Sequence, residues 1–208
     1  MHKETFAPQT ELLWNLFSTS DIVAPTTGFY LAGGTSLALQ LGHRQSEDLD
    51  FFTQSELLPA RITERMQHLG TLSVSQDEPQ TIHAVLNDVK VSFLSYPYPL
   101  YFPLLELDGR LLADERDIAA MKLSAIAGRG AKKDFIDVFF LLQKYSLETM
   151  LGFFETMFAK QQYNRLHVIK SLIYFNDAEP DPDPIMVLPA DWEVVKQHIK
   201  TEVAQLSL

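Results

Sequence analysis

The stretch LAGGTSLAL at residues 31–39 decides the fold of the first half of the chain. Its pattern predicts a short apolar strand, a turn at two glycines, and then a helix capped by Thr35 or Ser36. Glycine lets a ligand approach the backbone, and the free amides of a helix N-terminus favour an anion such as phosphate. The same pattern is also typical of a simple tight turn, so the following residues must decide between the two.

Those residues are RQSEDLDFF at 44–52, in which 49–52 is predicted to be a strand. Asp48 and Asp50 alternate along it, so both carboxylates would point to one face, about 6.6 Å apart along the chain. Mg²⁺ prefers one or two carboxylates together with substrate phosphates. The alternative is that both decorate a solvated strand edge, but two aspartates on one face repel each other unless a cation lies between them. We therefore predict a metal site at Asp48 and Asp50.

Other phosphate and metal motifs do not fit these residues. A P-loop requires a lysine after its last glycine, whereas Thr35 follows Gly34. A dinucleotide fingerprint requires a third glycine where Leu37 stands. Phe52 occupies a ligand position of an EF-hand loop, which excludes a calcium loop.

The composition bounds the class of protein. The chain has 208 residues, 46% of them hydrophobic, with no cysteine and a net charge of −10. The absence of cysteine excludes a disulfide framework and favours a reducing, cytoplasmic location. No apolar run is long enough for a membrane span, and the first residues do not resemble a signal peptide. The negative charge disfavours general binding to nucleic acid, so any RNA contact is expected to be local.

The pattern of elements predicts an α/β (α+β) fold in two domains. Residues 1–112 are expected to form a small mixed-sheet α/β domain, and residues 113–208 a helical domain packed against it. A loop is expected at 177–184, where three prolines exclude a helix. The expected helices are 10–17, 35–41, 56–69, 114–128, 133–145, 147–158 and one from Asp191 onward. The expected strands are 29–32, 49–52, 71–75, 81–86 and 89–94, the last two joined by a hairpin turn at Asn87 and Asp88.

A second group of charged residues lies in the helical part. Lys122 has helical spacing with Ile118 and Ile126, which places it on or beside the apolar face of its helix. Either its ammonium group extends to the rim of that face, or it reaches into a cleft to meet phosphate oxygens. Both interpretations remain open from the sequence.

Asp134 and Asp137 follow a basic run made of Arg129, Lys132 and Lys133. Asp134 could simply cap the next helix and pair with a basic neighbour. Alternatively, the two aspartates hold Lys122 or Arg129 in place, or one of them acts as general base for an acceptor hydroxyl. The sequence does not choose between these roles.

Taken together, residues 33–52, 118–126, 129–130 and 133–137 resemble the AbiEii/AbiGii toxin family of nucleotidyltransferases, over roughly residues 10–145. This family belongs to the DNA polymerase beta-like superfamily. The resemblance implies a small α/β catalytic domain beside a helical domain, and transfer of a nucleotide from an NTP with Mg²⁺, for which Mn²⁺ could substitute. It also implies a toxin of a type IV toxin–antitoxin or phage-defence system, with a tRNA or RNA acceptor and an antitoxin encoded nearby.

The resemblance also implies roles for individual residues. Asp48 and Asp50 would hold the metal, and Lys122, Asp134 and Asp137 would complete the catalytic set. The nucleotide-binding residues would be Gly33, Gly34, Thr35, Ser36, Arg44, Ser46, Lys122 and Arg129. An RNA acceptor would meet the local basic patch of Arg129, Lys132 and Lys133.

One position departs from the superfamily pattern. A third carboxylate is expected on a later strand, where this chain carries Ser92, and Asp88 lies back at the hairpin turn. Asp134 or Asp137 could substitute for it. The alternatives are a catalytically degenerate nucleotide-binding or partner-binding protein, and a small-molecule nucleotidyltransferase acting on cationic, antibiotic-type acceptors. His43, His83 and Glu47 are expected to have no chemical role.

Overall fold

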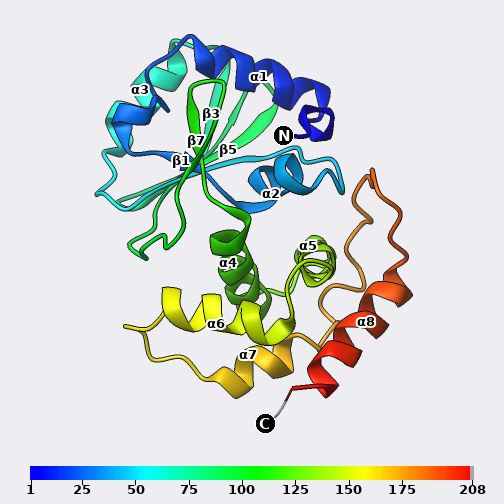
Figure 1. Ribbon diagram of the computed structural model, residues 1–208. Coiled ribbons are helices and arrows are strands. Elements are labelled where there is room, and N and C mark those ends of the chain that lie inside the picture. The colour runs from blue at the N-terminus through cyan, green and yellow to red at the C-terminus, as the bar shows by residue number, and fades with distance from the viewer. Residues whose placement is uncertain (207–208) are drawn as a thin grey trace. The chain divides into compact units, whose positions relative to one another are not determined.

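The structure is a computed structural model that describes residues 1–206, and its chain divides into two compact units (Figure 1). The first unit is Met1–Asp114, and the second starts at Glu115. Within the described residues, no helix has the length and apolar character needed to cross a membrane.

The first unit is built on a mixed seven-stranded sheet in the order β3-β4-β5-β2-β1-β7-β6. The β2·β5 and β1·β7 pairs are parallel, and the remaining pairs are antiparallel. This confirms the predicted α/β class with a mixed sheet. The strands are β1 (Tyr30–Leu31), β2 (Leu49–Thr53), β3 (Leu72–Glu78), β4 (Thr81–Leu86), β5 (Val89–Ser95), β6 (Leu105–Leu107) and β7 (Arg110–Leu112).

Helices of the first unit cover the sheet and enclose its core. They are α1 (Pro8–Ser18), α2 (Gly33–Leu41) and α3 (Pro59–Gln67), with short 3-10 turns η1 (Lys3–Thr5) and η2 (Pro25–Thr27). In Figure 1, α1 and α3 lie on the same side of the sheet. Trp14 and Phe17 of α1, Met66 of α3, and Phe51 and Phe93 of the sheet belong to one buried cluster. This apolar face fixes the strands that carry the candidate site on their other face.

The sequence analysis missed the hairpin formed by β6 and β7. Each strand has only three residues, which is too short for alternation to be recognised. The turn between them lies at Asp108 and Gly109, both with positive φ. β7 matters because it pairs in parallel with β1, the strand that leads into the two glycines. The helix predicted at 56–69 is shorter and starts at Pro59, because proline suits the first position of a helix.

The described part of the second unit is built mainly from helices. Its helices are α4 (Glu115–Gly128), α5 (Lys132–Leu142), α6 (Leu147–Met157), α7 (Arg165–Ser171) and α8 (Trp192–Ala204). Ser146, Asn164 and Asp191 cap α6, α7 and α8 through side-chain oxygens that accept backbone N–H groups. As predicted, residues 177–184 contain no helix and a last helix follows Asp191.

The Pro/Asp-rich segment is held against the start of α5 by Lys132. The Lys132 ammonium group donates to the Asp181 carbonyl at 2.5 Å and to Asp183 Oδ1 at 3.0 Å. The Lys132 backbone N–H also donates to Asp181 Oδ2 at 2.9 Å. The Lys132 side chain is only 7% exposed, so water competes weakly at its ammonium group, although the Asp183 side chain is 80% exposed. The basic run therefore contributes one of its lysines to structure.

We predict that Lys132→Met releases the segment 177–184 while leaving the helices folded. The loss of charge-assisted hydrogen bonds should lower the free energy of unfolding by about 1.5–3 kcal/mol. Limited proteolysis followed by mass spectrometry should show new cleavage within 177–184. Lys160→Met, at an exposed turn position, is the matched control and should change neither measurement. Unchanged proteolysis in Lys132→Met would show that Lys132 does not anchor the segment.

Candidate functional site

The diglycine turn starts α2 directly. Ala32 is the N-cap residue of this helix and makes no side-chain capping bond, so the predicted cap at Thr35 or Ser36 is wrong. Both hydroxyls lie inside the first turn and have other partners. The N-terminal amides of α2 are therefore not capped by a side chain, which suits a site for an anionic ligand.

The two glycines are required by close neighbours from the segment after the helix. Gly33 has φ +65°, and a Cβ there would lie 3.1 Å from Asp50 Oδ2. A Cβ on Gly34 would collide with the guanidinium group of Arg44. The Asp50 carboxylate and the Arg44 guanidinium thus each pack against one residue of the turn. This is the association of turn and carboxylate that the sequence predicted.

Thr35 ties the first turn of α2 to the acidic segment. Its hydroxyl donates to the backbone carbonyl of Asp48 and lies 2.7 Å from the Ser46 hydroxyl. Arg44 is buried beside them, and its Nη1 donates to the Gln45 carbonyl at 3.0 Å. The structure therefore brings together the predicted residues Gly33, Gly34, Thr35, Arg44, Ser46, Asp48 and Asp50.

Asp48 and Asp50 are half-buried and lie at the start of β2. Asp50 belongs to the strand, while Asp48 comes immediately before it. Among the side chains that the structure describes, no group of three or more Asp, Glu, His or Cys residues is able to hold a metal. Two carboxylates next to a helix N-terminus without a side-chain cap are nevertheless a donor set that fits Mg²⁺, because this ion takes its other ligands from water and substrate phosphates.

A row of polar side chains crosses the sheet from Asp50. Asp50 on β2 is in register with Ser92 on β5, and Ser92 is in register with His83 on β4. Residues in register share a face of the sheet. His83 Nδ1 lies 3.0 Å from Ser92 Oγ, which is within hydrogen-bond distance. The sequence analysis assigned His83 no role. Its alternation with buried Ile82 and Ala84 was visible, but the register that aligns it with Ser92 was not.

In the second unit, Lys122 forms a buried charge cluster with Asp134 and Asp137. Lys122 Nζ lies 2.8 Å from Asp134 Oδ1 and 2.5 Å from Asp137 Oδ2. The lysine side chain is 6% exposed and both aspartates are fully buried. Lys122 therefore does not extend to a solvated rim. Asp134 does not cap α5, whose N-cap is Ala131, and it binds Lys122 instead.

Arg129 completes this cluster from the more exposed side. Its Nε lies 3.2 Å from Asp134 Oδ2, and its side chain is 65% exposed. Burial tends to raise the pKa of Asp134, but the attraction of Lys122 and Arg129 outweighs it and holds that pKa below its ordinary value. Asp134 is therefore charged at neutral pH and a weak proton acceptor.

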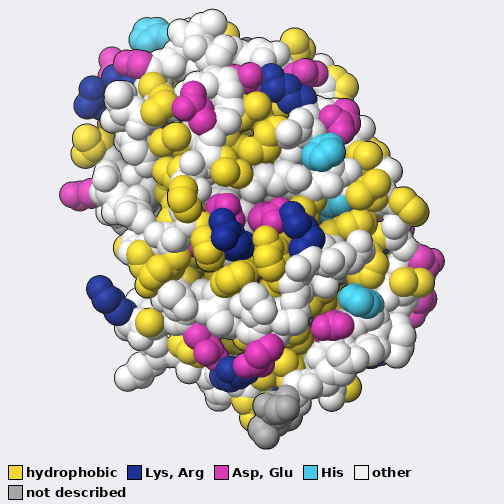
Figure 2. Space-filling model, viewed as in Figure 1, with side chains coloured by type: hydrophobic (Ala, Val, Ile, Leu, Met, Phe, Trp, Pro, Cys, Tyr) yellow, Lys and Arg dark blue, Asp and Glu magenta, His cyan; other side chains and the backbone are white. Residues whose placement is uncertain are grey.

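The structure does not bring every predicted residue to a site. Ser36 is fully buried, and its hydroxyl donates weakly to the Ala113 carbonyl at 3.4 Å. The Lys132 ammonium group donates hydrogen bonds to Asp181 and Asp183. The predicted basic patch is therefore reduced to Arg129 and Lys133. On the face shown in Figure 2, Lys and Arg side chains are interspersed with Asp and Glu. That face offers no broad positive area for a polyanion.

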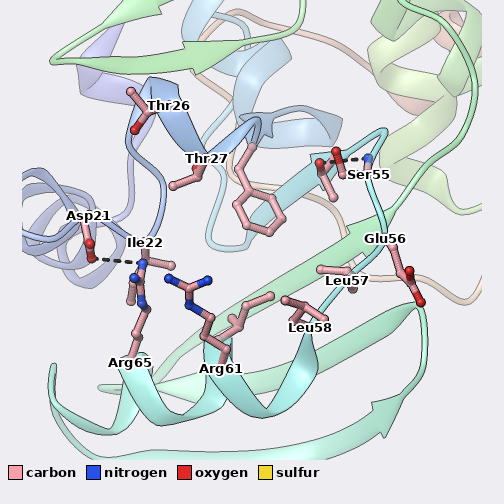
Figure 3. Close-up of a pocket in the computed structure, with 13 residues that line it drawn as sticks. Asp21, Ile22, Thr26, Thr27, Ser55, Glu56, Leu57, Leu58, Arg61 and Arg65 are labelled. Carbon is pink, nitrogen blue, oxygen red and sulfur yellow. Dashed lines mark hydrogen bonds and ion pairs between the residues drawn. The ribbon is translucent and has the colours of Figure 1, made fainter.

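A separate pocket of about 330 Å³ lies at the other end of β2, next to Thr53 (Figure 3). Its wall includes Phe29, Leu57 and α3, from which Arg61 and Arg65 point inward. Arg65 is paired with Asp21 at 3.1 Å. None of the predicted site residues lines this pocket, so we do not assign it to the site built on the diglycine turn.

The fold is shared with several solved structures, including the following two. JHP933 from Helicobacter pylori matches with a TM-score of 0.56 and 18% sequence identity, covering 93% of this chain and 88% of that one. MenT4, the nucleotidyltransferase toxin Rv2826c from Mycobacterium tuberculosis H37Rv, matches with a TM-score of 0.58 and 16% identity, covering 92% of this chain and 80% of its own. The chain therefore has the same fold as these two proteins, one of which is described as a nucleotidyltransferase toxin.

Sequence comparison gives the family. The description "Nucleotidyl transferase AbiEii toxin, Type IV TA system" applies to a family that matches residues 16–113 and 111–205. A protein of Aquifex aeolicus (strain VF5), named "Uncharacterized protein aq_aa25", is 37% identical over 191 residues, covering 85% of this chain and 87% of its own. The chain belongs to the AbiEii nucleotidyltransferase toxin family. The resemblance drawn from the sequence is confirmed.

We predict that Gly33→Ala strains the turn and displaces the Asp50 carboxylate. A left-handed backbone at a residue with a Cβ costs about 1–2 kcal/mol, which should appear as a lower free energy of unfolding in urea. Gly152→Ala is the control, because a Cβ at this helical position meets nothing within 4 Å. That control should be neutral or stabilising by about 0.5–1 kcal/mol. Equal stability of Gly33→Ala and wild type would contradict the described turn.

A second prediction concerns acid stability. Because the folded-state pKa of Asp134 is lowered from 3.8, its contribution is fully present above pH 3.8 and is lost as the pH falls through the folded value. At pH 7, Asp134→Asn should cost on the order of 3 kcal/mol, since it removes one partner of a buried ammonium group. Urea titrations from pH 7 to pH 2 should show the two proteins converging in acid. A constant difference across that range would contradict the assigned pKa direction.

Proposed function

We propose that this nucleotidyltransferase moves a nucleoside monophosphate from an NTP to an acceptor hydroxyl, using Mg²⁺ held by Asp48 and Asp50. The observation that carries the proposal is the Asp50 carboxylate lying against Gly33, at the uncapped N-terminus of α2. The start of α2 would offer backbone amides to phosphates. The adjacent segment at the start of β2 would offer the carboxylates of Asp48 and Asp50 to a cation. Mg²⁺, when bound, neutralises charge that develops on the phosphate oxygens during the transfer.

In the first unit, some residues would bind the triphosphate and others would hold the segment with the carboxylates in position. The amides at Gly33, Gly34 and Thr35 would donate to the triphosphate, helped by the positive end of the α2 dipole. The Arg44 guanidinium, packed against Gly34, would add a positive charge close to these phosphates. Ser46, bonded to Thr35, would keep the Asp48 segment in place. Positioning and electrostatic stabilisation then supply most of the rate enhancement.

For the second unit we propose that Lys122 and Arg129 bind the nucleotide. Asp134 and Asp137 would fix the Lys122 ammonium group, since both accept from it and have no exposure to solvent. Arg129 has most of its side chain in water and one bond to Asp134, so it can approach a ligand without leaving a buried charge behind. Any replacement by these aspartates of a catalytic carboxylate is disfavoured by their complete burial.

The acceptor that we favour is an RNA of the tRNA type, with the protein as the toxin of a type IV system and an antitoxin as its counterpart. The family description supports this proposal. A second candidate is a cationic small molecule. The net charge of −10 and the loss of Lys132 from the basic patch favour that alternative.

The test is transfer of label from α-labelled NTPs in the presence of Mg²⁺, with bulk tRNA and a panel of aminoglycosides as separate acceptors. Wild type should label one class of acceptor, and Asp48→Asn and Asp50→Asn should each lower the rate by at least about 100-fold. Glu47→Gln, at the exposed position immediately before Asp48, is the control and should retain activity. Full activity in the double variant Asp48→Asn/Asp50→Asn would show that the site is misassigned.

A further inference from the structure

We propose that His83 and Ser92 form a proton relay that takes the proton from the attacking acceptor hydroxyl. The inference rests on the proposed function, because it concerns the acceptor side of that same reaction. It gives a role to His83, which was expected to have none, and to Ser92, which stands where a carboxylate was expected.

The relay lies in line with the proposed metal site. Asp50, Ser92 and His83 occupy adjacent strands β2, β5 and β4, in register and on one face of the sheet. Adjacent strands lie about 4.8 Å apart, so Ser92 is the direct neighbour of Asp50 and His83 is one strand further. An acceptor hydroxyl oriented by a cation at Asp50 would therefore meet Ser92 first.

The contact between Ser92 and His83 has the geometry of a relay. The Ser92 hydroxyl can donate to His83 Nδ1 across 3.0 Å when the imidazole carries its proton on Nε2. Ser92 is 9% exposed and His83 is half-buried, so the pair is largely protected from water but still accessible to it. His83 Nε2 makes no hydrogen bond to any residue that the structure describes.

The other charged candidates are less suited to accept a proton. Asp134 is fully buried, bound to Lys122 and Arg129, and its pKa is held below the ordinary value. Asp137 is likewise fully buried against Lys122. Asp48 and Asp50 are committed to the cation in the proposed function. The His83 imidazole, whose Nδ1 lies 3.0 Å from Ser92 Oγ, is placed to accept the proton, and imidazole is the most common general base in proteins.

Proton transfer to His83 accompanies formation of the new bond to phosphorus. The acceptor oxygen forms a bond to the α-phosphorus of the NTP as its proton passes to Ser92 Oγ. The Ser92 proton passes at the same time to His83 Nδ1, so Ser92 stays neutral and His83 becomes an imidazolium. The bond between the α-phosphorus and the bridging oxygen breaks, and pyrophosphate leaves with the electron pair. The imidazolium then returns its proton to water.

The experiment compares single-turnover label transfer, with saturating Mg·NTP and the acceptor class that wild type prefers. His83→Asn keeps an acceptor for the Ser92 hydroxyl but cannot take its proton, and we expect about 100-fold slower transfer. His83→Ala should be equally slow and should be accelerated by added imidazole, which a purely structural role would not produce. Thermal stabilisation by Mg·NTP should be unchanged in both variants.

A carboxylate placed at position 92 provides the decisive control. Ser92→Asp would accept the proton directly beside Asp50, so it should be active and should make His83 dispensable. The double variant Ser92→Asp/His83→Asn should therefore transfer as fast as Ser92→Asp. Activity of His83→Asn within about threefold of wild type would overturn the relay. So would a double variant as slow as His83→Asn while Ser92→Asp alone is active.

Failure of the relay is distinguishable from failure of the proposed function. If wild type transfers label and Asp50→Asn does not, but the His83 variants are fully active, only the relay is wrong. If wild type labels neither tRNA nor aminoglycosides, the proposed function is wrong and the relay is overturned with it.

Discussion

The contact between the Asp50 carboxylate and Gly33 is the constraint on which the candidate site depends. It requires a left-handed residue without a Cβ at the start of α2, and a strand that brings the carboxylate back beside it. The antiparallel pairing of β1 with β2 supplies that return, since Leu31 is in register with Phe51. Phe51 points into the core, so Asp50 must face the other way. Packing of Phe51 in the core thus fixes the Asp50 carboxylate on the opposite face of β2.

The charge cluster of the second unit follows a different principle. Lys122, Asp134 and Asp137 are buried together, and their mutual attraction offsets the cost of removing them from water. Such a cluster gives a single orientation to the Lys122 ammonium group. It also explains why Lys122 sits at an apolar position of α4, which periodicity alone could not explain. The Lys122 charge is paired with two aspartates of α5 and is not exposed to solvent.

The sequence predicted the local elements that surround the candidate site, and its predictions failed where distant segments meet. The turn at Gly33 and Gly34, the strand at Asp50 and the hairpin at Asn87 were predicted correctly because each depends on a few adjacent residues. The strands of 105–112 were missed because three-residue strands carry no readable period. Ser36 and Lys132 were misjudged because their partners, Ala113 and Asp181, are more than 45 positions away along the chain.

The same limit applies to Ser92 and His83. The sequence showed that a carboxylate was absent from residue 92, but the strand register that sets His83 beside it comes from pairing across the sheet. The strand register and the contact between Nδ1 and Oγ place His83 beside Ser92, the residue that stands where a carboxylate was expected. The family assignment fixes the class of reaction, while details of this kind concern the individual chain.

The most direct measurement is a crystal structure of the protein with Mn²⁺ and a non-hydrolysable NTP analogue, using anomalous diffraction to locate the metal. The account predicts a manganese peak in contact with both Asp48 and Asp50, with the triphosphate along the amides of Gly33 and Gly34. A metal bound elsewhere, or a nucleotide that does not touch the diglycine turn, would contradict it.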